Sequence, residues 1–406
     1  MTLLIKATHQ QTKEHNRNLV LKHIFDHEAI SRAELSRITR LTRTTVSEIV
    51  AELIDEGLVT EIGVGESLGG KSPILLSLAK DSRCLIGVDI AQNHVQGAVV
   101  NLRGEIKETI TVPVFEHFGE KPLKHIFEIL DQLVKSSCRP ICGIGVGAPG
   151  LVSTSEGIVI NAVNFDWKDF PLAKILQERY QLPVYIYNDC QAAAMGEYLY
   201  GGYHRKGTNL VVINVGYGIG SGIIINGKLF QGDGGGAGEI GHVVVVHEQG
   251  KPCRCGHYGC LESVASAQAI ARDAKELLQF PAHLSSHELS EALILDEAEK
   301  AFIAGHPAIR DLILNSAQYL GYAIASLVGT LNIHHIVLIG EMTRFGPAWL
   351  EVIRNTMLKA SLSRLANSTS IEIGKLGNHS TLLGAAALLV NNYSLLFTKN
   401  FSRTTL

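Results

Sequence analysis

The chain has 406 residues, which is enough for two or three domains. Its composition, 46% hydrophobic and 18% charged, is ordinary for a globular protein. A net charge of −3 excludes nucleic-acid binding over the whole surface, so any DNA contact must come from a local patch. No continuous apolar run reaches the ~18 residues of a membrane span, and the N-terminus is too polar for a signal peptide. We therefore expect a cytoplasmic protein without membrane contact.

The N-terminal segment predicts two successive helices. Apolar side chains recur with helical spacing over 18–27, which favours a first helix there. Ser31 and Glu34 have the spacing of a capping box. A second helix is therefore predicted to begin near Ser31 and to run to about Thr39.

A longer third helix is predicted after a short turn. Thr42 can cap its start, and Gly57 is placed to end it. Beyond Gly57, the segments LVTEI and PILLSL are predicted strands around a glycine-rich loop at 63–73. The apolar face of the third helix consists of Val46, Ile49, Val50, Leu53 and Ile54.

A short helix, a tight turn, a longer helix and a β-wing are typical of a winged helix-turn-helix, which we assign to residues 1–82. Residues 1–60 hold eight Lys or Arg and eight Asp or Glu, so a module that binds another protein is the alternative. Arginines nevertheless dominate 31–43, where Glu34 is the only acid. We expect the DNA contacts to come from Arg32, Arg43, Thr44, Thr45, Ser47 and Lys71.

The remaining residues, 83–406, alternate strands and helices. Three strands in succession (CLIGVDI, VQGAVVN and EIKETITV) precede a helix over 121–136 and the strand ICGIGVG. A second set of strands (NLVVINV and SGIIING) begins near residue 210, and HHIVLIG follows at 334–340. This repetition indicates two related α/β lobes with a ligand cleft between them.

A cysteine cluster, CRCGHYGC at 253–260, predicts a metal site. Three thiols within eight residues can converge on one ion, and a closed tetrahedral zinc site needs one more ligand. His242, His247 and His257 are the candidates for it. With four ligands the site has no free position, so we expect one structural zinc per chain, held by Cys253, Cys255, Cys260 and most favourably His242. The other four cysteines lie in apolar contexts and indicate a reducing compartment: Cys84, Cys138, Cys142 and Cys190.

The segment GYGIGSGIIINGKLFQGDGGGAGEIGH, followed by CRCGHYGCLE, resembles the signature and zinc loop of the ROK family of repressors and sugar kinases. APG at 148–150, YND at 187–189 and LGAAALL at 383–389 also match the family, so the resemblance covers 83–391. It implies a two-lobed, actin-like (ribonuclease-H-like) sugar-kinase-type fold, with a zinc loop at about 242–262. It also implies that this domain carries the dimer contacts.

The same resemblance implies a sugar site. Asn188 and Asp189 match the pair that holds sugar hydroxyls, although Asp189 lies at a strand-to-helix junction, where it can also serve as a helix cap. Glu239 and His242 match the E-x-G-H motif, and Glu262 matches the acid that reaches the anomeric side. Asn164 lies where a family asparagine contacts sugar. Convergent acids, amides and an imidazole suit a pyranose, because each hydroxyl both donates and accepts.

The nucleotide-binding elements depart from the kinase pattern. Family kinases have D-x-G-G-T in the first phosphate loop, whereas this chain has DIAQN at 89–93. The second loop, usually G-T-G, is GYG at 216–218, and the adenosine segment is IGE at 339–341. Phosphoryl transfer depends on positioned backbone donors and Mg²⁺. We therefore expect no catalytic residues and no enzymatic activity.

Together these features predict a sugar-responsive transcriptional regulator, a repressor of carbohydrate uptake or catabolism genes. It would bind a palindromic operator as a homodimer, with assembly into tetramers left open. A monosaccharide of the glucose, xylose or N-acetylglucosamine class would release or modulate it, as in the family repressors that this sequence resembles. The alternatives are a sugar kinase with a DNA-binding head and a protein-binding scaffold.

Overall fold

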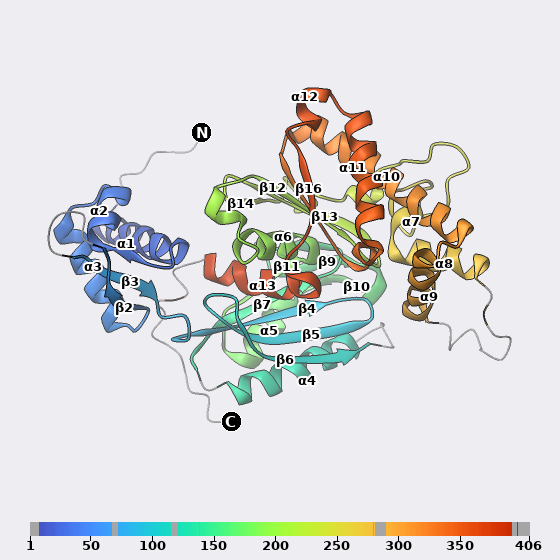
Figure 1. The fold of residues 1–406 in the computed structure, drawn as a ribbon. Coiled ribbons are helices and arrows are strands. Elements are labelled where there is room, and N and C mark those ends of the chain that lie inside the picture. The colour runs from blue at the N-terminus through green and yellow to red at the C-terminus, as the bar shows by residue number, and fades with distance from the viewer. Residues whose placement is uncertain are drawn as a thin grey trace.

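The computed structural model describes residues 8–66, 72–114, 121–137, 139–278, 280, 290–391 and 396. Figure 1 shows a small N-terminal head beside a larger domain with two lobes. This arrangement confirms the expected fold class, a winged helix-turn-helix followed by a two-lobed α/β domain.

The head holds three helices and a three-stranded antiparallel sheet in the order β1-β3-β2. Capping sets the predicted helix starts: the Ser31 hydroxyl accepts from the Glu34 amide at 3.1 Å, and the Thr42 hydroxyl accepts from the Thr45 amide at 3.2 Å. Strand β1 was not predicted from the sequence, because two residues are too few to show the alternation of a strand. The elements are α1 (His9–Asp26), β1 (Ile30–Ser31), α2 (Arg32–Thr39), α3 (Arg43–Asp55), β2 (Val59–Val64) and β3 (Ile74–Leu78).

The apolar face of α3 anchors this helix in the head. Val46, Ile49, Val50 and Leu53 are buried, as predicted, in one core with the apolar residues of α1. Each such side chain contributes about 1.5–3 kcal/mol when it leaves water, so burial rather than helix propensity holds α3 in place. Gly57 follows the helix with φ +70°, a left-handed conformation that suits glycine at a helix end.

The first lobe is built on a mixed sheet in the order β11-β7-β4-β5-β6. β4, β7 and β11 are parallel, so their carboxyl ends meet at one edge. Asp89 near the end of β4 and Asn188 at the end of β11 therefore lie at that edge. The strands are β4 (Cys84–Ile90), β5 (His94–Asn101), β6 (Ile106–Pro113), β7 (Ile141–Ala148) and β11 (Val184–Asn188).

Helices α4 (Lys121–Ser136) and α13 (Ser380–Asn391) pack on this sheet where glycines make room. A β-carbon on Gly97 would lie 2.4 Å from Ile129 Cγ2 of α4. A β-carbon on Gly145 would lie 2.0 Å from the Ala385 carbonyl oxygen of α13. A larger residue at either position would force the helix away from the sheet. A small sheet and one helix complete the lobe: β8 (Leu151–Ser153), β9 (Ile158–Ala162), β10 (Trp167–Phe170) and α5 (Leu172–Tyr180).

The second lobe repeats the same plan, with the strand order β14-β13-β12-β15-β16. In both lobes three antiparallel strands in succession are extended by two parallel ones, which confirms the prediction of two related lobes. The strands are β12 (Leu210–Val215), β13 (Ile219–Ile225), β14 (Lys228–Phe230), β15 (His335–Ile339) and β16 (Ser370–Ile373).

Helices beyond those expected from the sequence surround the second lobe. Among the described residues, α10 is the helix long and apolar enough to cross a membrane by length and composition, yet half of that stretch is buried inside the domain. It packs along α11, as the core helix of a globular domain does. These helices are α7 (Glu262–Ala265), α8 (Ala267–Leu277), α9 (Glu291–Ile303), α10 (Pro307–Leu331), α11 (Gly346–Ala360) and α12 (Ser363–Ala366).

Two helices lie side by side between the sheets of the two lobes, α6 (Asp189–Leu199) and α13 (Figure 1). Their backbones approach closely, because a β-carbon on Gly384 of α13 would lie 1.7 Å from the Ala192 carbonyl oxygen of α6. α6 begins directly after β11, at the edge where Asp89 lies. Asn188 and Asp189, which were predicted to line the ligand cleft, are therefore placed at the start of a helix that both lobes contact.

Candidate functional site

The outward face of α3 carries most of the residues predicted to contact DNA. Arg43, Thr44 and Ser47 are exposed, and Arg43 has no ion-pair partner among the described residues. Thr45 is half-buried, and its hydroxyl lies 2.9 Å from that of Thr42, so it takes part in the helix cap. The surface thus offers one unpaired guanidinium and short hydroxyls, which suit phosphates and base edges.

Arg32 has a different position from the other predicted contacts. Its guanidinium pairs with the Glu61 carboxylate at 2.9 Å, which ties α2 to strand β2 of the wing. Both side chains remain partly exposed, so the pair contributes little to stability. Two predicted site residues fall outside the described part of the chain: Lys71, and the side chain of Asn164 in the 3₁₀ turn η1 (Val163–Phe165).

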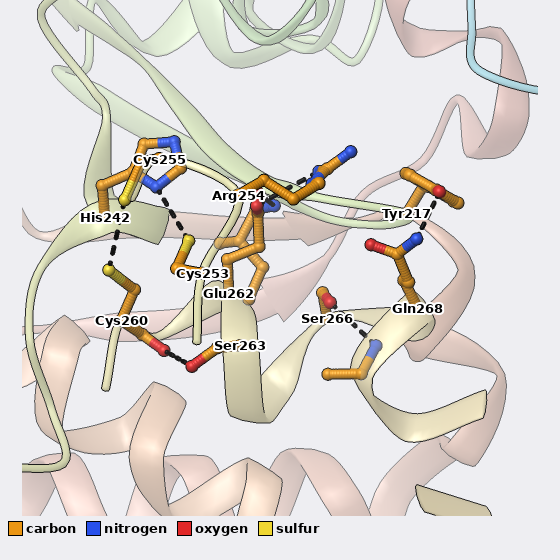
Figure 2. A network of polar contacts seen from close by, with 12 residues as sticks. Tyr217, His242, Cys253, Arg254, Cys255, Cys260, Glu262, Ser263, Ser266 and Gln268 are labelled. Carbon is orange, nitrogen blue, oxygen red and sulfur yellow. Dashed lines mark hydrogen bonds and ion pairs between the residues drawn. The ribbon is translucent and has the colours of Figure 1, made fainter. Parts of the chain in front are cut away.

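Three cysteines and one histidine converge beside the second lobe (Figure 2). His242 ends the 3₁₀ turn η3 (Ile240–His242), and the cysteines follow in the loop before α7. One donor atom from each of the four residues lies within 4.8 Å of all the others. The members of this cluster are His242, Cys253, Cys255 and Cys260.

The spacing of these donors fits one tetrahedral ion. Cys253 Sγ lies 3.6 Å from His242 Nδ1, and Cys255 Sγ lies 3.6 Å from Cys260 Sγ. Metal–sulfur bonds of about 2.3 Å and metal–nitrogen bonds of about 2.0–2.1 Å give tetrahedron edges of roughly 3.6–3.8 Å. Two of the donor distances therefore match a tetrahedral ion, and all four donors are close enough together to bind the same ion.

The geometry selects His242 among the three candidate histidines. His257 Nδ1 lies 3.6 Å from Cys255 Sγ but does not belong to the mutually close group. His247 is exposed and also outside the group. The other described cysteines, Cys84, Cys142 and Cys190, are buried thiols that form no disulfide, as expected for reduced core residues, whereas Cys138 lies outside the described residues.

Glu262 begins α7 two residues after Cys260, and its side chain is 10% exposed. Its Oε2 accepts from the Ile219 amide at 3.0 Å, and its Oε1 pairs with Arg254 at 3.1 Å (Figure 2). The Arg254 guanidinium also lies over the Tyr217 ring, 5.1 Å from its centre. Arg254 was not predicted as a site residue from the sequence. Its position between Cys253 and Cys255, two candidate metal ligands, could have indicated it.

The pair expected to hold sugar hydroxyls lies at the start of α6. Asn188, not Asp189, is the N-cap: its Oδ1 accepts from the amides of Cys190 and Gln191 at 3.0 and 3.1 Å. Its Nδ2 donates to the Gly150 carbonyl oxygen at 3.0 Å. This corrects the alternative that Asp189 acts as the cap. Asp189 is half-buried, and burial raises its pKa even though its Oδ1 accepts from the Cys190 amide.

Glu239 and His242 connect the metal cluster to the cleft. The Nε2 atom of His242 lies 3.9 Å from Glu239 Oε2, while its Nδ1 faces Cys253. Burial raises the pKa of Glu239 against the opposing effect of His242, and the charges of Asp189 and Glu262 raise it further. The carboxyl groups of Asp189 and Glu262 are thus close enough to Glu239 to affect its pKa. The imidazole of His242 lies beside Glu239.

Two side chains lie at the turn 216–218, which was compared above with the second phosphate loop of the family kinases. Glu341 begins the 3₁₀ turn η4 (Glu341–Phe345), and its Oε2 would lie 2.6 Å from a β-carbon on Gly216. The Tyr217 hydroxyl is hydrogen-bonded to the side-chain amide of Gln268. A carboxylate and a phenol therefore occupy the turn where a phosphate needs backbone amides and small residues.

Asp89 is buried beneath this region. It is 8% exposed and makes no side-chain hydrogen bond among the described residues. Burial raises its pKa to about 8, and the charges of Asp189 and Glu341 act in the same direction. At neutral pH this raised pKa favours the protonated form of Asp89.

Comparison with known proteins agrees with both parts of the chain. Residues 14–60 match the winged helix-turn-helix DNA-binding family, and residues 85–392 match the ROK family. The chain is 33% identical over 403 residues to the xylose repressor of Caldicellulosiruptor bescii, which covers 95% of this chain and 98% of that protein. A glucokinase of Halalkalibacterium halodurans is 35% identical over 317 residues, covering 76% of this chain and 95% of the enzyme.

The fold comparison extends over the head as well. A crystal structure of a ROK family transcriptional regulator, a homolog of the E. coli MLC protein, superposes with a TM-score of 0.79 at 27% identity. It covers 95% of this chain and 98% of that one, whereas the glucokinase covers 76% of this chain. The chain belongs to the ROK family and combines its sugar-kinase-type domain with an N-terminal winged helix-turn-helix.

Proposed function

We propose that this protein is a sugar-responsive transcriptional repressor of carbohydrate uptake or catabolism genes. One observation carries the proposal: an exposed recognition-helix face and a sugar-kinase-type domain occur on one chain. The carboxylate of Glu341 and the phenol of Tyr217 lie at the turn where a kinase would hold phosphate, which argues against nucleotide binding. The full-length similarity to a xylose repressor supports the proposal. The sugar half of the cleft keeps its polar side chains.

The sugar site is built from Asn188, Asp189, Glu239, His242 and Glu262, with Asn164 as a further contact. Asp189 and Glu239 present carboxyl groups whose pKa values are raised, so each can accept from one hydroxyl or donate to another. Glu262 is held in place by Arg254 and the Ile219 amide, and thus offers its carboxylate in a fixed orientation. The effector would be a monosaccharide of the xylose, glucose or N-acetylglucosamine class.

The metal in the cluster would be zinc, one per chain. Three thiolates and an imidazole are the donor set that zinc prefers in closed structural sites, and no position remains for a reactive water. The ion would fix His242 through Nδ1, leaving Nε2 directed to Glu239 and to a sugar hydroxyl. It would also anchor the segment that carries Glu262.

A sugar kinase with a DNA-binding head is the second candidate, because the glucokinase of H. halodurans matches this domain at 35% identity. Against it stands the carboxylate of Glu341 on the second phosphate loop, which would repel the nucleotide phosphates. Phosphoryl transfer depends on backbone donors placed around those phosphates. We therefore propose that the chain binds sugar without phosphorylating it.

We propose that the chain acts as a homodimer on a two-fold operator, because one helix-turn-helix reads only a half-site. The dimer contacts would lie in residues 83–406, and pairing of dimers into tetramers stays open. Sugar binding would weaken operator binding, because a ligand shifts such an equilibrium only through different affinities for two states. All of these steps take place without a membrane, in the cytoplasm.

The experiment uses the full chain and a DNA duplex that the protein itself selects from a random library. Calorimetry with D-xylose, D-glucose and N-acetyl-D-glucosamine tests sugar binding, and fluorescence anisotropy tests the duplex with and without each sugar. One sugar should bind and weaken DNA binding by at least about fivefold. Asp189→Asn should abolish sugar binding and keep DNA affinity, whereas Asp169→Asn, an exposed aspartate of the same lobe, should change neither.

Two outcomes would contradict the proposal. The first is that no sequence is selected from the library. The second is ATP-dependent phosphorylation of one of the three sugars at ordinary kinase rates, lost in Asp189→Asn, which would establish the kinase instead.

A further inference from the structure

Helix α6 joins the two ends of the molecule on which the proposed function depends. Its first turn carries Asp189 in the cleft, and its last turn carries Tyr198, beside the head. Its eleven residues span about 16 Å, and all residues from Cys190 to Leu199 are buried. A helix enclosed on all sides in a close-packed interior moves as a unit with its neighbours.

A buried carboxylate fixes α6 to the second lobe. Glu197 is completely buried, and its two oxygens accept from the amides of Lys375 and Leu376 at 3.2 and 3.0 Å. The Ser380 hydroxyl, at the start of α13, donates to the same carboxylate at 3.0 Å. Any movement of the second lobe against the first therefore reaches α6 directly.

The C-terminal end of α6 contacts helix α1 of the head through a row of rings. Tyr198 lies 6.3 Å from His204, and His204 lies 6.4 Å from Phe25 of α1, measured between ring centres. The His204 Nδ1 atom also lies 3.2 Å from the Tyr198 carbonyl oxygen, which holds the ring against the end of α6. Phe25 is 2% exposed, so this contact is part of the core and not a surface touch.

Arg103, in the turn between β5 and β6, binds the C-terminal end of α1. Its guanidinium donates to the carbonyl oxygens of Ile24 (3.4 Å), Phe25 and His27 (2.9 Å). It also lies 5.1 Å from the centre of the Phe25 ring. Carbonyls at a helix end have no intrahelical partner and carry the negative end of the helix dipole, so a cation there is stabilising.

The turn that carries Arg103 rests on the end of α6. A β-carbon on Gly104 would lie 2.6 Å from Cδ1 of Tyr200, the residue that follows α6, so only a glycine permits the turn to lie on this ring. Gly104 also has φ +81°, a conformation that favours glycine. The chain of contacts thus runs from Asp189 through α6 and Tyr200 to Arg103 and α1.

A second arginine makes a comparable contact at the recognition helix. Arg83, in the connection to the larger domain, donates to the Glu56 carbonyl oxygen at the end of α3 at 3.0 Å. Apolar residues of α1, α3, α6 and α13 belong to one continuous core. The head is therefore packed on the larger domain and does not hang from a linker.

We propose that α6 couples the sugar cleft to the DNA-binding head and that Arg103 is the positioning residue that joins them. The inference rests on the proposed function and names the path by which it is regulated. A sugar held by Asp189 shifts the start of α6, and the buried helix carries that shift to Arg103. The orientation of α1, and with it that of α3, changes relative to the lobes.

Arg103→Ala in the full chain tests this path. The sugar affinity of the DNA-free protein, with D-xylose as the first probe, should stay within about twofold of the wild type. The factor by which the sugar weakens binding to the selected duplex should fall from at least about fivefold to near one. Arg103→Lys keeps the charge but loses the forked donors, so it should give a partial loss. Retention of the full sugar effect in Arg103→Ala would overturn the inference.

A matched control and a sugar-independent readout separate this inference from the proposed function. Arg205→Ala removes an arginine at the same boundary, but its pair with Glu28 is exposed, so the sugar effect should be kept. Amide hydrogen exchange without sugar should be at least about fivefold faster at 21–27 in Arg103→Ala, with α3 little changed. Unchanged exchange would refute the role of Arg103. Absence of a sugar effect in the wild type, with faster exchange in the variant, would instead refute the proposed function.

Discussion

A carboxylate oxygen of Glu341 lies 2.6 Å from the point where a β-carbon on Gly216 would stand. The two residues belong to different segments of the second lobe, and their close approach leaves no room for a side chain at position 216. The same carboxylate contributes to the raised pKa of Asp89 across the cleft. One side chain thus adds both bulk and negative charge beside Gly216.

Glu341→Gly should therefore improve nucleotide binding. The wild type should bind a non-hydrolysable ATP analogue only weakly by calorimetry, and removal of the charge and bulk should lower the Kd by about tenfold or more. Glu341→Gln keeps the size and removes the charge, so it should lie between the two. If the wild type binds the analogue as tightly as Glu341→Gly, the contact with Gly216 does not exclude nucleotide.

Asp89 should make stability depend on pH. Its pKa is about 8 in the folded chain and near 3.8 when unfolded, so the unfolded state ionises first as the pH rises. The contribution of Asp89 is fully present below about pH 4 and is lost as the pH approaches 8, at up to about 1.4 kcal/mol per pH unit. Asp89→Asn should therefore gain stability relative to the wild type between pH 5 and 8.

Chemical denaturation of both proteins across this pH range measures the difference. The control is Asp169→Asn, the same change at an exposed position, for which the difference from the wild type should not vary with pH. A constant difference between Asp89→Asn and the wild type from pH 5 to 8 would show that Asp89 is ionised in the folded state.

The cysteine cluster predicts joint loss of metal and sugar. Cys255→Ser removes one of four ligands, so the zinc content should fall from about one per chain to near zero by elemental analysis. Sugar affinity should fall with it, because Glu262 follows the cluster and His242 loses its fixed orientation. His247→Ala, a histidine of the same loop outside the cluster, should retain both. Loss of zinc with intact sugar affinity would remove the coupling between the two sites.

Arg43 should be a DNA contact. It is exposed at the first position of α3 and has no ion-pair partner among the described residues. Arg43→Ala should weaken binding to the selected duplex by about tenfold, and the salt slope should fall by about one if the contact is to phosphate. The control is Lys300→Ala, which removes one positive charge from α9 of the larger domain. It should leave the DNA affinity and the salt slope unchanged. Unchanged affinity and slope in Arg43→Ala would exclude Arg43 from the interface.

Local signals allowed much of the fold to be predicted. The caps at Ser31 and Thr42, the apolar face of α3 and the seven strands named from the sequence of the larger domain each depend on residues close in sequence, and these are confirmed. The remaining strands of the larger domain, such as β8, β14 and β16, were not predicted. Two other features were not predicted from the sequence: the pairing of β1 with β3, and the helices around the second lobe. A two-residue strand is defined only by its partner. Helix α10 was not predicted, although its buried apolar residues and its exposed polar residues, such as Asn315 and Gln318, recur with helical spacing.

The candidate site was predictable in its residue types but not in its contacts. The cysteine spacing indicated a metal site, and the structure brings His242 to it. The sequence offered Asp189 as a cap of α6, and only the backbone conformation shows that Asn188 takes this role. The bond from Arg254 to Glu262 depends on how the cysteine loop folds back. The placement of Glu341 on Gly216 likewise joins segments that only the folded second lobe brings together.

The most direct test of the central claim is the reciprocity of sugar and operator binding. Calorimetry should give the sugar Kd for the free protein and for the protein saturated with its selected DNA duplex. If sugar and DNA favour different states of one molecule, the sugar Kd should rise on DNA by the same factor by which sugar raises the DNA Kd, at least about fivefold. An equal sugar Kd with and without DNA would contradict the account.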